Sequence, residues 1–155
     1  MNVIGKKQSD LNLDQYTYPN NLNTALDLLV EAVKDEKEDE IFYNQLMSIA
    51  PNEEAKEIIK GIRDDEKKHN RMFREIYYFL TNHELSENAA RLTSPTHYCD
   101  GLKKAVRGET NAVTMYRKIL FAMEDEVHQN MLFEIITDEI RHASLFNLLF
   151  AMRGC

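Results

Sequence analysis

Two Asp-Glu-x-x-His motifs lie 73 residues apart in this chain, at residues 65–69 and 138–142. Each motif sets a Glu and a His three residues apart, which puts both side chains on one face of a helix. The same shift relates a Glu and a Tyr upstream of each motif. The repeated positions are Glu36, Tyr43, Asp65, Glu66 and His69, matched by Glu109, Tyr116, Asp138, Glu139 and His142. Two Glu-x-x-His motifs and two lone Glu residues are the ligand set of a carboxylate-bridged dinuclear metal site in a four-helix bundle.

Apolar residues at heptad spacing predict four helices around this repeat. The first covers residues 22–48, and the second runs from a break at Pro51 and Asn52 to about residue 80. The third covers residues 98–123, and the fourth begins after a cap at Asp125. In the first helix, Glu36 takes a core position where an apolar residue is expected. A charge there is costly unless it is paired or binds a metal.

The spacing also predicts the topology. Glu36 lies 15 residues before the turn near residue 51 and Glu66 lies 15 after it, so both sit roughly 22 Å from the turn. Glu109 and Glu139 are related in the same way about a turn near residue 124. Residues 81–97 form a polar connection long enough to carry the chain back along the bundle. We therefore expect an all-α, antiparallel four-helix bundle with one long crossover between the second and third helices.

Length and composition fit one domain. We expect a bundle over residues 21–152 and a polar N-terminal arm over residues 1–20. The net charge of −7 argues against binding to nucleic acid or to an anionic membrane surface. No apolar run approaches the length of a membrane span. Cys99 and Cys155 form no C-x-x-C pair, so we expect no disulfide and a soluble protein in the reducing cytoplasm.

The predicted site has balanced charges. Four carboxylates in one core carry four negative charges, and no Lys or Arg occupies a core position to neutralise them. Two divalent cations would neutralise them, and oxygen and nitrogen ligands with open positions favour iron or manganese over structural zinc. Asp65 and Asp138 either accept the free N–H of the His on the facing helix or are surface acids. Tyr43 and Tyr116 either lie near the site or pack in the core.

The other polar residues of interest are assigned to different roles. His83 and His97 fall in the crossover and are expected to be exposed. His128 lacks a Glu three residues before it and is expected at a helix boundary, not as a ligand. Asp39 falls on the core side of the first helix, where it either tilts to the edge or supports the site.

At these residues the sequence resembles the ferritin-like di-iron carboxylate superfamily, specifically its rubrerythrin/bacterioferritin branch, over residues 22–150. The resemblance implies a ferritin-like bundle with two iron ions per subunit, with manganese as the alternative metal. It also implies that Glu66 and Glu139 bridge the ions. The terminal ligands would be Glu36 and His69 at one ion and Glu109 and His142 at the other. Members of the branch react ferrous iron with O₂ or hydrogen peroxide.

The chain departs from its relatives at informative positions. Rubrerythrins have a further Glu three residues after the third-helix Glu, where this chain has Ala112, and they usually carry a rubredoxin module. A separate electron donor is therefore expected. Bacterioferritin has a haem-ligating Met where this chain has Lys67, so no haem is expected. Because the chain stops at Cys155, without the fifth helix of ferritin cages, we expect a homodimer.

Two functions follow from the resemblance. The first is a di-iron oxidoreductase that reduces peroxide or O₂ during oxidative stress. The alternative is a ferroxidase or iron-storage protein of bacterioferritin type, in which iron is the substrate. A bundle whose metal is purely structural is the non-enzymatic possibility.

Overall fold

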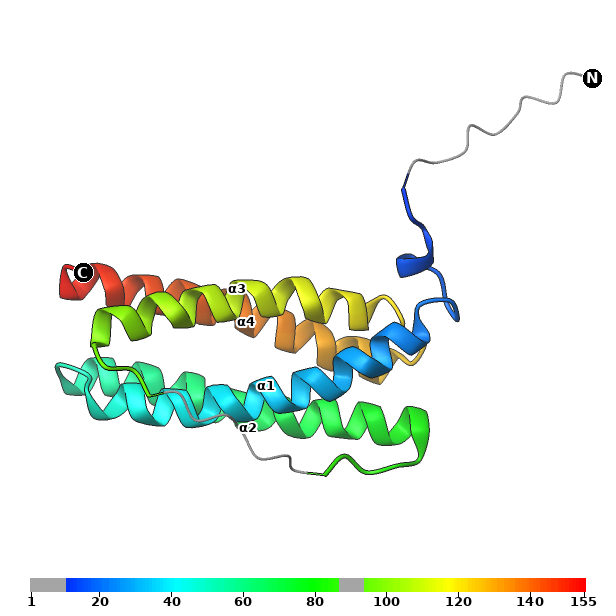
Figure 1. Ribbon diagram of the computed structural model, residues 1–155, viewed down its shortest axis with the longest axis horizontal. Coiled ribbons are helices and arrows are strands. Elements are labelled where there is room, and N and C mark those ends of the chain that lie inside the picture. The colour runs from blue at the N-terminus through cyan, green and yellow to red at the C-terminus, as the bar shows by residue number, and fades with distance from the viewer. Residues whose placement is uncertain (1–10, 87–93) are drawn as a thin grey trace, which may run out of the picture.

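Four long helices dominate the computed structural model (Figure 1). The structure describes residues 11–86 and 94–155, and no β-strand occurs within them. The helices are α1 (Leu22–Ser48), α2 (Glu53–Thr81), α3 (Tyr98–Leu120) and α4 (Glu126–Arg153), and a short 3-10 helix spans Asp14–Tyr16. None of the described helices has an apolar window long enough to cross a membrane. The expected all-α fold is confirmed.

The helices form two antiparallel hairpins, α1 with α2 and α3 with α4. Helix α3 begins at the end of the bundle opposite to the one where α2 stops, so α2 and α3 run parallel (Figure 1). The expected bundle with one long crossover is confirmed. Of the expected N-terminal arm, residues 1–10 lie outside the described part of the chain, while residues 11–20 are exposed. Within the crossover predicted over residues 81–97, residues 87–93 also lie outside the described part.

Side chains cap the N-termini of α2 and α4. The Asn52 side chain accepts a hydrogen bond from the Ala55 N–H at 2.9 Å and so caps α2. Asp125 caps α4 by accepting from the Val127 N–H at 2.9 Å. The third helix ends at Leu120 and not near residue 123, because the chain tightens into consecutive i→i+3 hydrogen bonds there.

The apolar core is divided into two clusters by a polar layer. One cluster lies toward the start of α1 and the end of α2, and includes Leu29, Phe73, Ile119 and Leu132. The other lies toward the α1–α2 turn, and includes Leu46, Ile59, Leu102, Phe146 and Leu149. On each helix the residues between the two clusters are the predicted ligands. The bundle therefore holds these side chains at mid-height, with packed apolar residues above and below.

A disulfide joins Cys99 in the first turn of α3 to Cys155, just after α4, with a Cα–Cα distance of 5.7 Å. The expectation of unpaired cysteines is therefore wrong. The cause is topological: in an antiparallel hairpin the first residues of α3 lie beside the last residues of α4. The cytoplasmic assignment rested partly on unpaired cysteines and loses that support.

Breaking this disulfide is expected to destabilise the bundle without disturbing its centre. A closed loop with a sequence separation of 56 residues contributes about 4 kcal/mol in the chain-entropy description. We expect Cys99→Ser to lower the free energy of unfolding in denaturant by roughly that amount. Cys155→Ser should have the same effect, and the double variant should add little to either. A larger loss in the double variant would show that the cysteines act separately.

Candidate metal centre

Six side chains from all four helices meet in the polar layer. Glu36 comes from α1 and Glu109 from α3, whereas α2 and α4 each supply a Glu and a His three residues apart. All six are 3% exposed or less. The members are Glu36, Glu66, His69, Glu109, Glu139 and His142. Buried acids at this density require compensation by positive charge.

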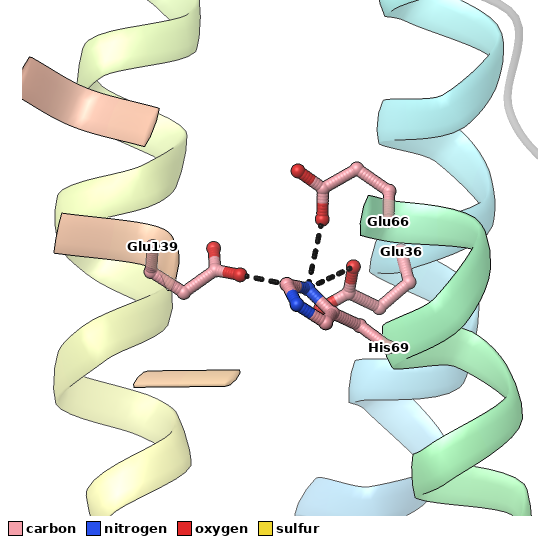
Figure 2. Close-up of side chains that lie close together, drawn as sticks. All are labelled: Glu36, Glu66, His69 and Glu139. Carbon is pink, nitrogen blue, oxygen red and sulfur yellow. Dashed lines mark ion pairs between the residues drawn. The ribbon is translucent and has the colours of Figure 1, made fainter. Parts of the chain in front are cut away.

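Three carboxylates converge on His69 (Figure 2). Its Nδ1 atom lies 3.1 Å from Oε1 of Glu139 and 3.3 Å from Oε2 of Glu66. Oε2 of Glu36 lies 3.7 Å from the same nitrogen. Helices α1, α2 and α4 thus aim their oxygen and nitrogen atoms at one point.

Carboxylates also converge on the second histidine, His142. Nδ1 of His142 lies 3.1 Å from Oε1 of Glu66 and 3.4 Å from Oε2 of Glu109. Two groups of four side chains result, each offering ligand atoms within 4.8 Å of one another. Their members are Glu36, Glu66, His69 and Glu139 in one group, and Glu66, Glu109, Glu139 and His142 in the other. Glu66 and Glu139 belong to both groups, as bridging carboxylates must.

Every member of the cluster has a ligand atom that the protein leaves unsatisfied. Within the described part of the chain, six buried atoms of the cluster have no hydrogen-bond partner: Oε2 of Glu36 and Glu109, Oε1 of Glu66 and Glu139, and Nδ1 of His69 and His142. Native proteins rarely leave buried polar atoms unpaired, and each exception calls for an explanation. Cations between these atoms would satisfy all six at once. The donor set of four carboxylates and two imidazoles therefore fits a pair of divalent ions.

In the metal-free site, burial and mutual repulsion shift the pKa values of the clustered acids. Burial, reinforced by the neighbouring carboxylates, raises the pKa values of Glu66 and Glu139 well above the ordinary value. Burial also opposes ionisation of Glu36, but contacts with Glu66 and His69 and a hydrogen bond from Tyr116 outweigh it and lower the Glu36 pKa. Without metal, the site therefore favours the protonated forms of the two shared Glu residues.

The pKa values of the two histidines are raised as well, and for a histidine a raised pKa favours the charged form. Burial opposes protonation of His142, but its hydrogen bond with Asp65 and its close contacts with the Glu109 and Glu66 carboxylates raise its pKa to about 12. The pKa of His69 is raised as well, because contacts with Glu139, Glu36 and Glu66 outweigh its burial. In the metal-free protein the imidazolium ions thus take the place of the cations.

Two buried tyrosines orient the outer carboxylates. The Tyr43 hydroxyl of α1 donates to Oε1 of Glu109 at 2.5 Å, and the Tyr116 hydroxyl of α3 donates to Oε1 of Glu36 at 2.6 Å. Burial and the nearby acids raise both tyrosine pKa values, so both groups remain donors. Of the two interpretations left open for these residues, the structure places both beside the site.

The aspartates of the motifs face the histidines of the opposite helix. Nε2 of His69 lies 3.2 Å from Oδ2 of Asp138. Nε2 of His142 lies 3.0 Å from Oδ2 of Asp65. A ring that donates Nε2–H to a carboxylate keeps Nδ1 directed at the cluster. The histidine of each motif is therefore oriented by the aspartate of the other motif.

Arg141 connects the two aspartates and was missed in the sequence. Its Nη2 atom lies 2.7 Å from Oδ2 of Asp65 and 2.8 Å from Oδ1 of Asp138. Together with the hydrogen bond from His142, it lowers the Asp65 pKa to about 2. The repeat places Lys68 at the matching position, but Lys68 pairs with Glu134. The only sequence signal was the spacing of Arg141, three residues after Asp138.

A cavity of about 380 Å³ opens between α1 and α3. Its wall includes Asp35, Asp39, Gly108, Ala112 and Tyr116. Tyr116 lines this cavity and also donates its hydroxyl to a carboxylate of the cluster. Asp39 is partly buried, and burial with the nearby acids raises its pKa well above the ordinary value. It lies at the edge of the site, on the cavity side.

The other histidines lie elsewhere. His83 and His97 are exposed at the two ends of the crossover, as expected. His128 is buried in the first turn of α4, where it packs edge-on against Phe79 with ring centroids 4.5 Å apart.

Comparisons with known proteins agree with this site and fold. The family model for rubrerythrin matches residues 8–77 and 27–150. A hypothetical protein from Pyrococcus furiosus is similar in structure, with a TM-score of 0.72 and 19% identity, over 83% of this chain and 89% of that one. A conserved hypothetical protein from Mycobacterium tuberculosis has a TM-score of 0.69 and 16% identity, over 84% of this chain and 98% of that one. At these identities the two structures show the fold alone. The comparison with curated proteins gives no match.

The matched residues include both Glu-x-x-His motifs and both lone Glu residues of the polar layer. The family model covers most of the chain, and the bundle places the six matched side chains around common points. This chain belongs to the rubrerythrin family.

Proposed function

We propose that the protein is a di-iron oxidoreductase that reduces hydrogen peroxide or O₂. The observation that carries this proposal is the set of six unpartnered ligand atoms, one from each member of the cluster. Glu66 and Glu139 would bridge two iron ions. Glu36 with His69 and Glu109 with His142 would complete the two ligand sets. The rubrerythrin family assignment supports iron as the metal, with manganese as the alternative.

The side chains around the site would orient the ligand atoms, and the four carboxylates would neutralise the charge of the two ions. Each Asp holds the Nε2–H of a His and leaves the Nδ1 lone pair for a cation. The tyrosine hydroxyls hold one oxygen of each outer Glu and leave the other oxygen for the ion. Packing above and below the layer fixes these positions before any ligand arrives.

Two ferrous ions held by these residues would supply the two electrons that, with two protons, reduce one hydrogen peroxide to two waters. The cavity between α1 and α3 gives small reactants a path to the Tyr116 side of the site. A separate protein or small molecule would return the electrons. No haem takes part in this proposal.

Anaerobic loading with Fe²⁺, followed by rapid mixing with oxidant, tests the proposal. We expect two iron ions per chain and oxidation of both by one equivalent of hydrogen peroxide, with repeated turnover when a reductant is supplied. Oxidation that continues to accumulate ferric iron far beyond two ions per chain would instead support the ferroxidase and storage function. Bound ferrous iron that neither hydrogen peroxide nor O₂ oxidises would leave the metal with a structural role and would overturn the proposal.

Arg141 gives a prediction with a matched control. Arg141→Met removes the cation between Asp65 and Asp138, so the aspartates hold the histidines less firmly. We expect metal affinity to fall about 10- to 100-fold. Lys68→Met changes the equivalent position of the repeat, which pairs with Glu134, and should leave the affinity within about twofold. Competition with a chelator measures both, and equal losses in the two variants would contradict the assigned role of Arg141.

A further inference from the structure

The internal repeat of the sequence breaks down at the cavity between α1 and α3, two helices that lie side by side on one face of the bundle (Figure 1). Helix α1 supplies four acids to the wall of this cavity: Glu31, Asp35, Glu38 and Asp39. A shift of 73 residues turns Asp35 into Gly108 and Asp39 into Ala112, and both of these residues also line the cavity. One wall of the cavity is therefore acidic, whereas the facing wall is uncharged and includes two of the smallest residues.

Gly108 has no local reason to be a glycine. It lies within α3, where glycine is a poor helix former. A Cβ atom at this position would have no neighbour within 4 Å, so no close approach of another group requires its absence. The small residues at positions 108 and 112 instead leave room for the cavity, whose 380 Å³ can hold several water molecules. The chain thus gives up helix propensity where doing so keeps the cavity open.

The charges around this cavity favour a cation inside it. Within the described residues, no Lys or Arg lines its wall. Lys34 pairs with Glu38 at 3.8 Å, and the Lys104 ammonium lies over the Phe42 ring, 4.2 Å from its centroid. A cleft lined by charges of one sign concentrates ions of the opposite sign and raises their association rates by about 10- to 1,000-fold. The acidic wall would therefore draw in divalent cations.

Tyr116 connects this cavity with the metal centre. Its side chain lines the cavity, and its hydroxyl donates a hydrogen bond to Oε1 of Glu36 at 2.6 Å. Glu36 is 1% exposed, and its other oxygen, Oε2, has no hydrogen-bond partner within the described chain. The same tyrosine thus borders the cavity and holds a carboxylate that still lacks a partner.

The other approaches to these ligands are less open in the described part of the chain. The two apolar clusters cover the polar layer toward both ends of the bundle. On the α2–α4 face, the Arg141 guanidinium binds Asp65 and Asp138. Behind these aspartates lie the rings of His69 and His142, which are 0% exposed and stacked with centroids 5.8 Å apart. A cation on that face would meet a positive charge and then two rings.

We propose that the cavity between α1 and α3 is the entry route by which divalent cations reach the buried ligands. The acids of α1 would attract the ions, and Gly108 and Ala112 would leave them room to pass. This inference rests on the metal centre of the proposed function. It concerns how fast ions arrive, however, whereas the centre itself determines how many ions are held.

Uptake of Co²⁺ by the metal-free full-length chain tests the route, because the absorption of bound Co²⁺ follows binding directly in a stopped-flow instrument. Gly108→Leu combined with Ala112→Leu should slow uptake at least about tenfold, since the contribution of the cavity to the association rate is lost. The final amount of bound Co²⁺ should stay the same. Gly61→Leu is the matched control, because Gly61 is a helical glycine of α2 with equally open surroundings. It should change the rate by less than about twofold.

A second pair of variants tests the role of charge. Glu31→Gln combined with Asp35→Asn should slow uptake about tenfold at low salt and less at high salt, where screening has already weakened the attraction. Glu54→Gln combined with Glu57→Gln removes the same charge from exposed positions of α2 and should have little effect. Circular dichroism and the final amount of bound Co²⁺ show whether each variant is intact.

The possible failures of this proposal are distinguishable. Uptake at the parental rate in the double-leucine variant, or equal slowing by the two pairs of charge variants, would overturn the entry route and leave the metal centre standing. Faster uptake in Arg141→Met, with no effect of the leucines, would place the entry on the α2–α4 face instead. A parent chain that binds no Co²⁺ would overturn the metal centre and the route together.

Discussion

Replacing Glu66 or Glu139 with glutamine is expected to reduce the bound metal below one ion per chain. Each residue belongs to both four-membered groups, so under the proposed function one substitution would remove an anionic ligand from both ions. A glutamine also leaves the site with one negative charge fewer against the same two cations. Metal analysis after loading and desalting measures the loss. Glu57→Gln, on the exposed side of α2, is the control and should keep two ions.

The same substitutions should leave the metal-free bundle folded and at least as stable as the parent. Burial and the neighbouring acids raise the pKa values of Glu66 and Glu139 in the metal-free state and so favour their protonated forms. Glutamine has nearly the same shape and cannot ionise, so it removes the cost of a buried acid. Retention of two ions in both variants would contradict the bridging role. Loss of metal together with loss of the fold would contradict the electrostatic account.

Regular features of the fold and site were predictable from the sequence. The first helix was expected over residues 22–48 and is observed over Leu22–Ser48. Heptad spacing fixed which face of each helix is buried, and an acid on that face stood out because burial of a lone charge is so costly. Equal distances from the hairpin turns then placed Glu36 and Glu66 at one height.

Features that depend on contacts between distant residues were not predictable in this way. Cys99 and Cys155 pair because two helix ends meet, and no local pattern records that meeting. Arg141 lies outside the heptad core, and its role comes from reaching Asp65 on another helix.

Metal removal should reverse the pH dependence of stability. In the metal-free protein, Glu66 and Glu139 have folded pKa values above the ordinary 4.5, and His69 and His142 have folded pKa values above the ordinary 6.5. A raised folded pKa contributes stability that is complete below the unfolded pKa and is lost as the pH rises through the folded pKa. The native state therefore binds more protons than the unfolded state, and its stability falls as the pH rises above about 4.5. Above about 6.5 the histidines steepen that fall.

Metal-loaded protein should behave in the opposite way. Ligands must lose their protons to bind, so raising the pH from 5 to 8 favours the loaded state and increases its free energy of unfolding. Each proton in the difference changes that free energy by about 1.4 kcal/mol per pH unit. Denaturant titrations with Fe²⁺ under anaerobic conditions, and with a chelator, measure the two slopes. Glu66→Gln combined with Glu139→Gln should flatten the metal-free slope most between pH 5 and 6.5, because two of the four protons no longer dissociate. Parallel slopes with and without metal would mean that the buried acids are not where the cations bind.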